Sequence, residues 1–244
     1  MRAIDILELL SKSKEGYTLT QLSTVLDSPK SSIFDIMKTL VFKNMVLEDN
    51  QSGVTRYKIG LQSFLIGSSY INDIDLVNIA RNDLIDFAIK MQATTFMAIL
   101  DDNMETYIYK YESERSIITT ANIGTRRSIH CAALGKAMIA FASKEEIEEA
   151  IAKTDFISYT QHTITSPDEY LKELEEVKQK GYAKDDRENT LQQIAAAAPI
   201  FDHTGQVVAS ISCVGFYESQ VNLDDLGVLV KAVADRISAK LGHC

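Results

Sequence analysis

Apolar residues recur three and four positions apart over much of the first forty residues, which is the spacing of amphipathic helices. Residues 3 to 12 predict a first helix, and residues 21 to 26 predict a short second one. Pro29 then interrupts the pattern, because proline cannot continue a helix but is tolerated in the first turn of a new one. The new helix has one apolar stripe, formed by Ile33, Ile36, Met37, Leu40 and Val41. Two helices across a short turn predict a helix-turn-helix, whose second helix reads the major groove of DNA.

The face opposite that stripe carries the candidate DNA contacts. Short hydroxyls and a lysine near a helix start suit phosphate, and side chains further along reach base edges. The candidates are Lys30, Ser31, Ser32, Phe34, Asp35 and Lys38, together with Thr20 on the preceding helix. A helical hairpin with a solvated polar face remains the alternative at this stage.

A basic hairpin follows these helices. Residues 45–48 and 54–59 alternate between apolar and polar positions around a turn-rich tip. Arg56 and Lys58 lie two positions apart, so they share one face of the second strand. Three helices followed by such a hairpin predict a winged helix-turn-helix domain over residues 1–60.

The remaining chain predicts a linker and a second domain. A helix from 61 to about 73 would join the two, giving a linker at 61–75 and a second domain at 76–244. In that domain, strand patterns at 95–100, 106–111, 117–121, 194–201 and 206–216 mix with helical patterns at 76–91, 130–142, 144–153, 167–180 and 223–241. Hairpins mixed with helices predict an α+β fold.

Composition and charge change this picture only slightly. The apolar and charged fractions, 45% and 24%, are those of a globular protein, and no apolar run approaches the ~20 residues of a membrane span. Three widely spaced cysteines argue against a disulfide framework and for the cytoplasm. The net charge of −9 opposes DNA binding, but residues 28–60 hold five basic and three acidic residues. A locally positive face on an acidic body still binds DNA.

Several segments together resemble the IclR family of bacterial transcription regulators. They are Ala3–Leu7, Thr18–Leu22, Pro29–Ser32, Arg56–Gly60, His130–Ala137, Gly181–Glu188 and Ala197–Ile200. The resemblance implies an N-terminal winged helix, a C-terminal GAF-like mixed α/β domain that binds a small-molecule effector, and homodimers or dimers of dimers on double-stranded, palindromic operator DNA. It places the effector near Ala133, Leu134, Gly135, Asp185, Ala195 and Ser212.

The chain departs from the family pattern at both sites. Phe34 and Asp35 stand where the family often has His-Arg or Tyr-Arg, and Lys38 stands where it has Arg. Asp35 repels phosphate but accepts a hydrogen bond from a cytosine amino group. Gln192 and Ala195 replace the usual Gly and Cys, so neither the operator nor the effector transfers from relatives.

The residues of the implied effector site favour an organic acid. Ser212 and the backbone N–H groups at the start of the helix predicted from His130 donate to a carboxylate. Asp185 repels an anion unless it is protonated or bonded to a hydroxyl, which favours a hydroxy or keto acid. The alanine-rich strand at 194–198 leaves room for either a ligand or a closely packed helix.

Other functions find less support. A hydrolase-like enzyme using His130 and Cys131 is one alternative, but adjacent residues on a helix point about 100° apart and do not readily hydrogen-bond to each other. The histidines and cysteines show no metal-ligand spacing. A metabolite-binding protein-interaction module would leave the basic wing unexplained. We therefore expect no catalytic residue, no metal, no cofactor and no membrane partner.

Overall fold

The computed structural model describes residues 2–50, 53–73, 75–114, 116, 121–217 and 222–243. The chain divides into two compact units, Met1–Ile74 and Asp75–Cys244. Residues 117–120 of the strand expected at 117–121 lie outside the described residues, and so does Cys244.

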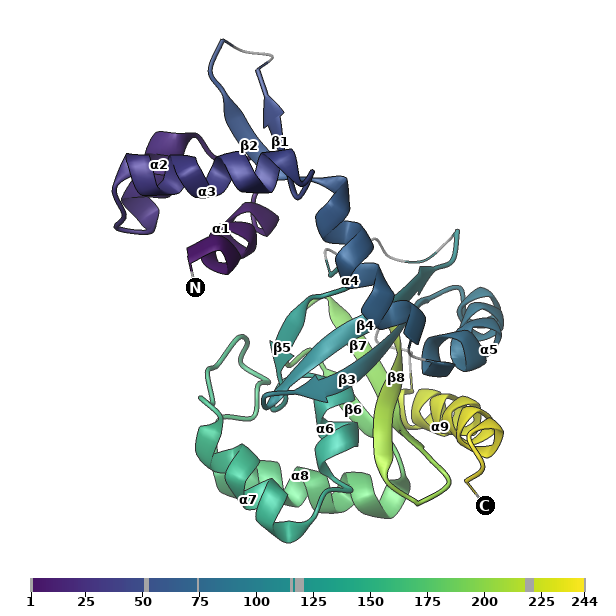
Figure 1. The fold of residues 1–244 in the computed structure, drawn as a ribbon. Coiled ribbons are helices and arrows are strands. Elements are labelled where there is room, and N and C mark those ends of the chain that lie inside the picture. The colour runs from purple at the N-terminus through teal and green to yellow at the C-terminus, as the bar shows by residue number, and fades with distance from the viewer. Residues whose placement is uncertain are drawn as a thin grey trace. The chain divides into compact units, whose positions relative to one another are not determined.

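The N-terminal unit is a winged helix-turn-helix. Its elements are α1 (Arg2–Ser11), α2 (Leu19–Val25), α3 (Lys30–Phe42), β1 (Val46–Asp49), β2 (Arg56–Ile59) and α4 (Leu61–Asp73) (Figure 1). A capping box starts α2: Gln21 N–H donates to Thr18 Oγ1 at 3.2 Å, and Thr18 N–H donates to Gln21 Oε1 at 2.8 Å. Pro29 is the N-cap of α3, as its missing N–H predicts.

One apolar core holds this unit together. Its buried side chains are Ile6, Leu10, Leu22, Ile33, Met37, Leu40, Val46 and Tyr57. The core therefore joins α1, α2 and α3 to both strands of the wing. Tyr17 and Tyr57 also form a backbone bridge that ties the wing to the loop before α2.

The C-terminal unit contains a six-stranded antiparallel sheet with the strand order β5-β4-β3-β8-β7-β6. Its strands are β3 (Thr94–Asp101), β4 (Met104–Glu112), β5 (Arg126–Ser128), β6 (Ala183–Asp186), β7 (Gln193–Phe201) and β8 (Val207–Phe216). β3 and β8 are central neighbours although more than one hundred residues separate them.

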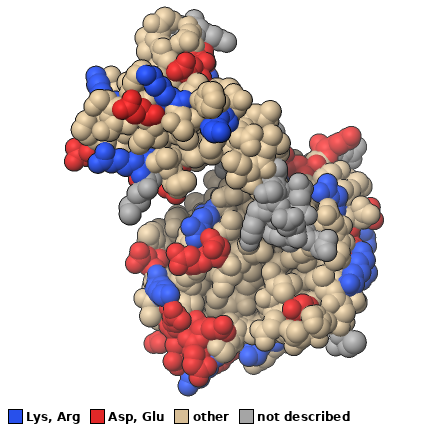
Figure 2. All heavy atoms as spheres, in the orientation of Figure 1, with Lys and Arg blue, Asp and Glu red and all other residues tan. Residues whose placement is uncertain are grey.

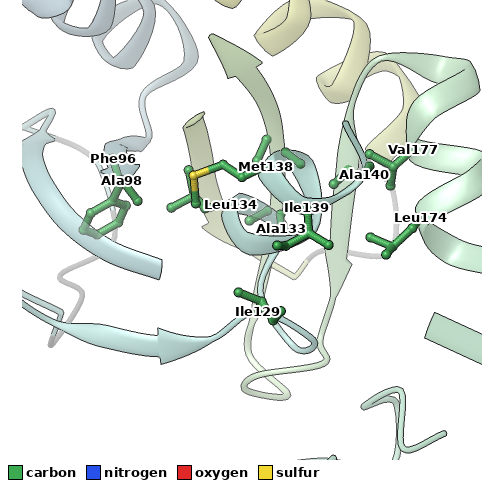
Figure 3. Close-up of a cluster of buried hydrophobic side chains, with 14 of the residues drawn as sticks. Phe96, Ala98, Ile129, Ala133, Leu134, Met138, Ile139, Ala140, Leu174 and Val177 are labelled. Atoms are coloured by element: carbon green, nitrogen blue, oxygen red, sulfur yellow. The ribbon is translucent and has the colours of Figure 1, made fainter. Parts of the chain in front are cut away.

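Helices cover both faces of this sheet. One face packs against α5 (Asp75–Met91) and α9 (Leu223–Lys240), and the other carries α6 (Ala133–Ile139), α7 (Lys144–Lys153) and α8 (Pro167–Lys180) (Figure 1). Figure 3 shows α6 between the sheet and α8, with Leu134 and Met138 on the sheet side. The two units together confirm the expected α+β fold with a GAF-like mixed domain.

The alanines of β7 allow α6 to lie close to the sheet. Ala195 and Ala197 belong to the core beneath α6, whereas Ala196 and Ala198 point to the opposite face, which α9 covers. All four are buried. Close helix packing is therefore one use of these small side chains.

Several details differ from the sequence prediction. In the N-terminal unit, α2 begins at Leu19, two residues before the expected start. The helix expected from His130 begins at Ala133, because residues 129–132 form turns and Ala132 is extended. The short strands β5 and β6 were not predicted. They pair with β4 and β7 through contacts that no local pattern encodes.

Gly227 offers a test of the packing between α9 and the sheet. A Cβ there would lie 2.2 Å from the Tyr182 ring, whose hydroxyl donates to Asp224 Oδ1 at 2.9 Å. Gly227→Ala must displace the ring and should destabilise the protein by about 1–3 kcal/mol in urea unfolding. Gly215→Ala is the control, because nothing lies within 4 Å of its added Cβ. Equal stability of both variants would contradict this account.

Candidate DNA interface and effector pocket

The polar face of α3 is exposed, as a DNA-reading surface requires. Lys30, Ser31, Asp35 and Lys38 are exposed, and Ser32 is half-buried. Thr20 on α2 is exposed too, and the Phe34 ring retains 42% of its surface. Lys38 Nζ lies 4.6 Å from the centroid of that ring, which supports the ammonium at the helix surface.

The start of α3 is also free to bind an anion. Pro29 contributes no side-chain hydrogen bond to the cap of this thirteen-residue helix. The N–H groups of its first turn have no intrahelical partners, and the helix dipole favours negative charge there. Ser31 and Lys30 flank the same turn, so backbone and side-chain donors converge on one place.

The wing is less available than its sequence indicated. Arg56 is half-buried and donates from Nη1 to the carbonyl of Gly16 at 3.1 Å, which fixes the strand to the loop before α2. Lys58 Nζ pairs with Asp49 Oδ2 at 2.8 Å. Both cations therefore have structural partners, and the pair with Asp49 halves the positive charge that this strand was expected to present.

Charge is distributed differently over the two units. Figure 2 shows basic and acidic side chains interspersed over the visible face of the N-terminal unit. Acidic side chains gather on the C-terminal unit around α7, whose sequence KEEIEEAIAK holds four glutamates. Most of the excess of acidic residues therefore belongs to the C-terminal unit and not to the N-terminal unit that contains α3.

Five of the six residues implied for effector binding line one cavity in the C-terminal unit, between the start of α6 and the sheet. They are Ala133, Leu134, Asp185, Ala195 and Ser212. Gly135 is not in the lining. An added Cβ at Gly135 would be 2.6 Å from the Cα of Ile129, so the glycine allows α6 to pack closely against that residue.

The cavity is small and polar on one side. It measures about 30 Å³, enough for one or two water molecules. Within the described part of the chain, Ser212 Oγ and Glu105 Oε1 are buried without a hydrogen-bond partner, and both residues line the cavity. Buried polar atoms are normally satisfied, so these two atoms are suited to hydrogen-bond a ligand in the cavity.

Sequence reasoning missed five polar residues of this lining. They are Glu105 and Tyr107 on β4, Arg127 on β5, Asn189 after β6 and Gln193 at the start of β7. Arg127 lies over the Tyr107 ring, 5.7 Å from guanidinium carbon to centroid. The signal that could have found them is weak, since β5 is three residues long and pairs only with β4.

Two buried carboxyl groups dominate the electrostatics of the cavity. Burial raises the pKa of Glu105 to about 7, against the opposing effects of Arg127 and the Gly135 N–H. Burial likewise raises the pKa of Asp185 to about 6, against Lys136 and two backbone N–H groups. Asp185 Oδ1 accepts from Glu188 N–H at 2.7 Å, so it also holds the turn after β6.

A larger hollow of about 320 Å³ lies at the other end of α6, lined by residues of α7 and the β3 and β8 ends. Its charged groups are already engaged: Glu146 caps Ser143 N–H, and Glu149 pairs with Lys153 at 2.6 Å. The smaller cavity has unpartnered buried atoms, which makes it the stronger candidate for a specific ligand.

His130 and Cys131 have no catalytic arrangement. His130 Nε2 donates to the Ile157 carbonyl at 3.0 Å, so Nδ1 is the acceptor for the Ser128 hydroxyl at 2.7 Å. Burial lowers the pKa of His130 and raises that of Cys131 to about 12. The His130 ring is thus neutral and links the Ser128 and Ile157 segments, and the Cys131 thiol is protonated.

The described residues contain no group of three or more His, Cys, Asp or Glu side chains that could hold a metal ion. They also include no helix that combines the length and apolarity needed to cross a membrane.

Comparisons with known proteins cover almost the whole chain. Residues 68–239 match the family described as bacterial transcriptional regulator IclR C-terminal, and residues 1–49 match the IclR helix-turn-helix domain. The regulator KdgR of Dickeya chrysanthemi is 28% identical over 100% of this chain and 79% of its own length. The repressor AllR of Escherichia coli is 31% identical over 99% of this chain and 89% of its own.

Solved structures of IclR proteins have the same fold as this chain. An IclR of Thermotoga maritima has a TM-score of 0.82 at 27% identity, covering 99% of this chain and 98% of that one. An IclR homologue of Microbacterium hydrocarbonoxydans, complexed with 4-hydroxybenzoate, shares the fold with a TM-score of 0.85 at 18% identity over 98% of this chain and 97% of that one. The chain therefore belongs to the IclR family of transcriptional regulators, with an N-terminal DNA-binding domain and a C-terminal effector-binding domain.

Proposed function

We propose that α3 and its uncapped start bind operator DNA, and that an organic acid bound in the small cavity beside α6 modulates this binding. The observation that carries the proposal is the pair of unpartnered buried atoms, Ser212 Oγ and Glu105 Oε1, in a cavity lined by the residues that the family resemblance implied. On this proposal residues 1–60 form the DNA-binding domain, residues 61–75 link the two domains, and residues 76–244 form the effector-binding domain.

On the DNA side, Thr20, Lys30, Ser31, Ser32, Phe34, Asp35 and Lys38 form the proposed interface, with Arg56 and Lys58 supporting it from the wing. Exposure of the α3 residues supports a direct role. The partners of Arg56 and Lys58, Gly16 and Asp49, support a mainly positioning role for the wing.

Lys38→Ala should weaken binding to DNA from upstream of the protein's own gene by about tenfold and reduce the salt dependence by about one ion. Lys58→Ala should have a smaller effect, because its ammonium already pairs with Asp49. Fluorescence anisotropy at several salt concentrations measures both. Lys144→Ala, an exposed lysine on α7, is the control. Wild-type affinity for Lys38→Ala, with the fold intact, would remove α3 from the interface.

On the effector side, an acid fits the donors that the cavity offers. Ser212 Oγ–H and the half-buried Arg127 guanidinium both favour a carboxylate. Asp185 would accept from a hydroxyl on the same ligand, which supports a hydroxy acid. The volume of about 30 Å³ means that the cavity must widen to admit such a molecule.

Ser212→Ala should weaken the response of the protein–DNA complex to small carboxylates by about tenfold or more, because a buried hydrogen bond to a charged group is lost. Pyruvate, lactate and glycerate are the probes, and half-maximal release or tightening of DNA is the measurement. Operator affinity without ligand should not change. Cys213→Ala, on the opposite face of β8, is the control. An unaltered response in Ser212→Ala would place the effector elsewhere.

Self-association is the third part of the proposal. One recognition helix reads only a few base pairs, so specificity requires two half-sites and two copies. The N-terminal unit exposes large apolar side chains on α1 and α4, about half of each or more: Ile4 59%, Leu61 66%, Phe64 66%, Leu65 49% and Ile66 53%. Such a concentration is typical of a surface that another chain covers.

Phe64→Glu should convert the dimer into a monomer at micromolar concentration, since it places a charge in the apolar interface. Sedimentation velocity measures the mass, and DNA affinity should fall in parallel. The matched control is Ile157→Glu, a similarly exposed residue of the C-terminal unit. A wild-type protein that sediments as a monomer in the presence of DNA would refute the dimer.

Catalysis is not part of the proposed function. The hydrogen bonds of His130 and the raised pKa of Cys131 support regulation over the hydrolase alternative. The buried free thiols of Cys131 and Cys213 and the DNA partner support a place in the cytoplasm.

A further inference from the structure

A side-chain carboxyl already occupies the start of α6. Gly135 N–H donates to Glu105 Oε2 at 2.6 Å, and the Glu105 side chain has no exposed surface. The sequence analysis had expected the effector's own carboxylate to accept from the backbone N–H groups at this helix start. An acidic effector therefore meets a carboxyl group where a free donor was expected.

The other oxygen of that carboxyl faces the cavity unpaired. Glu105 comes from β4 and Ser212 from β8, and both line the cavity beneath α6. Among the described residues neither Glu105 Oε1 nor Ser212 Oγ has a partner at hydrogen-bond geometry, although the Tyr107 hydroxyl lies close enough to the Glu105 carboxyl to favour its ionised form. A protonated carboxyl donates through O–H, so in that state Glu105 and Ser212 both offer a donor to a ligand in the cavity.

The charged neighbours of Glu105 make an ionised carboxyl unfavourable beside an anionic ligand. Arg127 on β5 favours ionisation, Asp185 on β6 opposes it, and the Tyr107 hydroxyl on β4 favours it. Cys131 and Tyr170 also interact electrostatically with Glu105. Burial raises the pKa of both groups, so they are neutral. A ligand carboxylate would add a third negative charge beside Glu105 and Asp185, where Arg127 and the glutamate-paired Lys136 are the nearby cations.

A proton removes this conflict at little cost. Burial already raises the pKa of Glu105 to about 7, so the neutral form is accessible near physiological pH. An anion bound next to it raises that pKa further, because like charges disfavour the ionised form. Uptake of the proton leaves the total charge of the cavity unchanged when the anion enters.

We propose that Glu105 is an effector-binding residue that takes up one proton from solvent as the acid binds, so that its Oε1–H and the Ser212 hydroxyl both donate to the ligand carboxylate. This inference rests on the acidic effector of the proposed function. Its consequence is that affinity for the acid increases as pH falls, and that the regulator reads acidity and acid concentration together.

The test uses the full-length protein and calorimetry with pyruvate, lactate and glycerate from pH 6 to 8.5. Above pH 7 the affinity of a bound carboxylate should fall by about tenfold per pH unit, the slope for one proton. Titrations in two buffers of different ionisation enthalpy should show close to one proton taken up per ligand at pH 8. The corresponding neutral amides should bind more weakly than the acids at pH 6.

Glu105→Gln separates this inference from a structural role. The amide keeps an acceptor for Gly135 N–H and donates to the carboxylate without a proton. Its affinity for the acid should be independent of pH, unaccompanied by proton uptake, and at least equal to that of the wild type at pH 8. Asp185→Asn is the control, and the wild-type slope above pH 7 should persist in it.

Each outcome decides the matter. A carboxylate that binds with no pH dependence, or a slope that survives in Glu105→Gln or disappears in Asp185→Asn, overturns the inference and leaves the acidic effector standing. Absence of binding by all three carboxylates at every pH overturns the acidic effector and the inference with it. In both cases the DNA-binding part stands on its own anisotropy measurement.

Discussion

A lysine side chain with no exposed surface holds the C-terminal unit in shape. Lys136 Nζ on α6 donates to Glu188 Oε1 at 2.6 Å and to Glu173 Oε1 at 3.1 Å. Burial alone would lower the pKa of Lys136, but the two glutamates raise it above its ordinary value. A buried cation is stable only with such partners, and loss of one partner typically costs about 3–5 kcal/mol. The interaction therefore ties α6 to α8 and to the turn after β6.

The position of the cavity follows from that constraint. α6 is only seven residues long, and Lys136 lies in its second turn. With the lysine fixed, Ala133 and Leu134 lie at the cavity, and Gly135 N–H points to Glu105. Asp185, three residues before Glu188, closes the opposite side through the turn that both residues shape. Structural groups and cavity-lining groups thus lie within three residues of each other on the same segments.

Local patterns in the sequence predicted the winged helix well, because its elements are long or have distinct ends. Pro29 marks the start of α3, and the apolar stripe of α3 faces the core where the spacing placed it, with Ile33, Met37 and Leu40 buried. The C-terminal site depends instead on contacts between distant residues. In the sequence, Glu105 falls in the predicted turn between two strands. In the structure it is a buried acid whose carboxyl accepts from the N–H of Gly135, thirty positions later in the chain. The short strands β5 and β6 escaped prediction for the same reason.

The alanines of β7 have a consequence for how such a regulator changes its ligand. Ala195 is both a contact of α6 and part of the cavity wall, and the cavity holds only about 30 Å³. A single added methyl group at this position would fill most of the empty space, and a glycine would extend it, without touching the buried charges. On the proposed function, the size of the acid is therefore adjustable at one position while the polar groups of the cavity stay fixed. Sensors for related acids of different length are accessible by replacement of one small side chain.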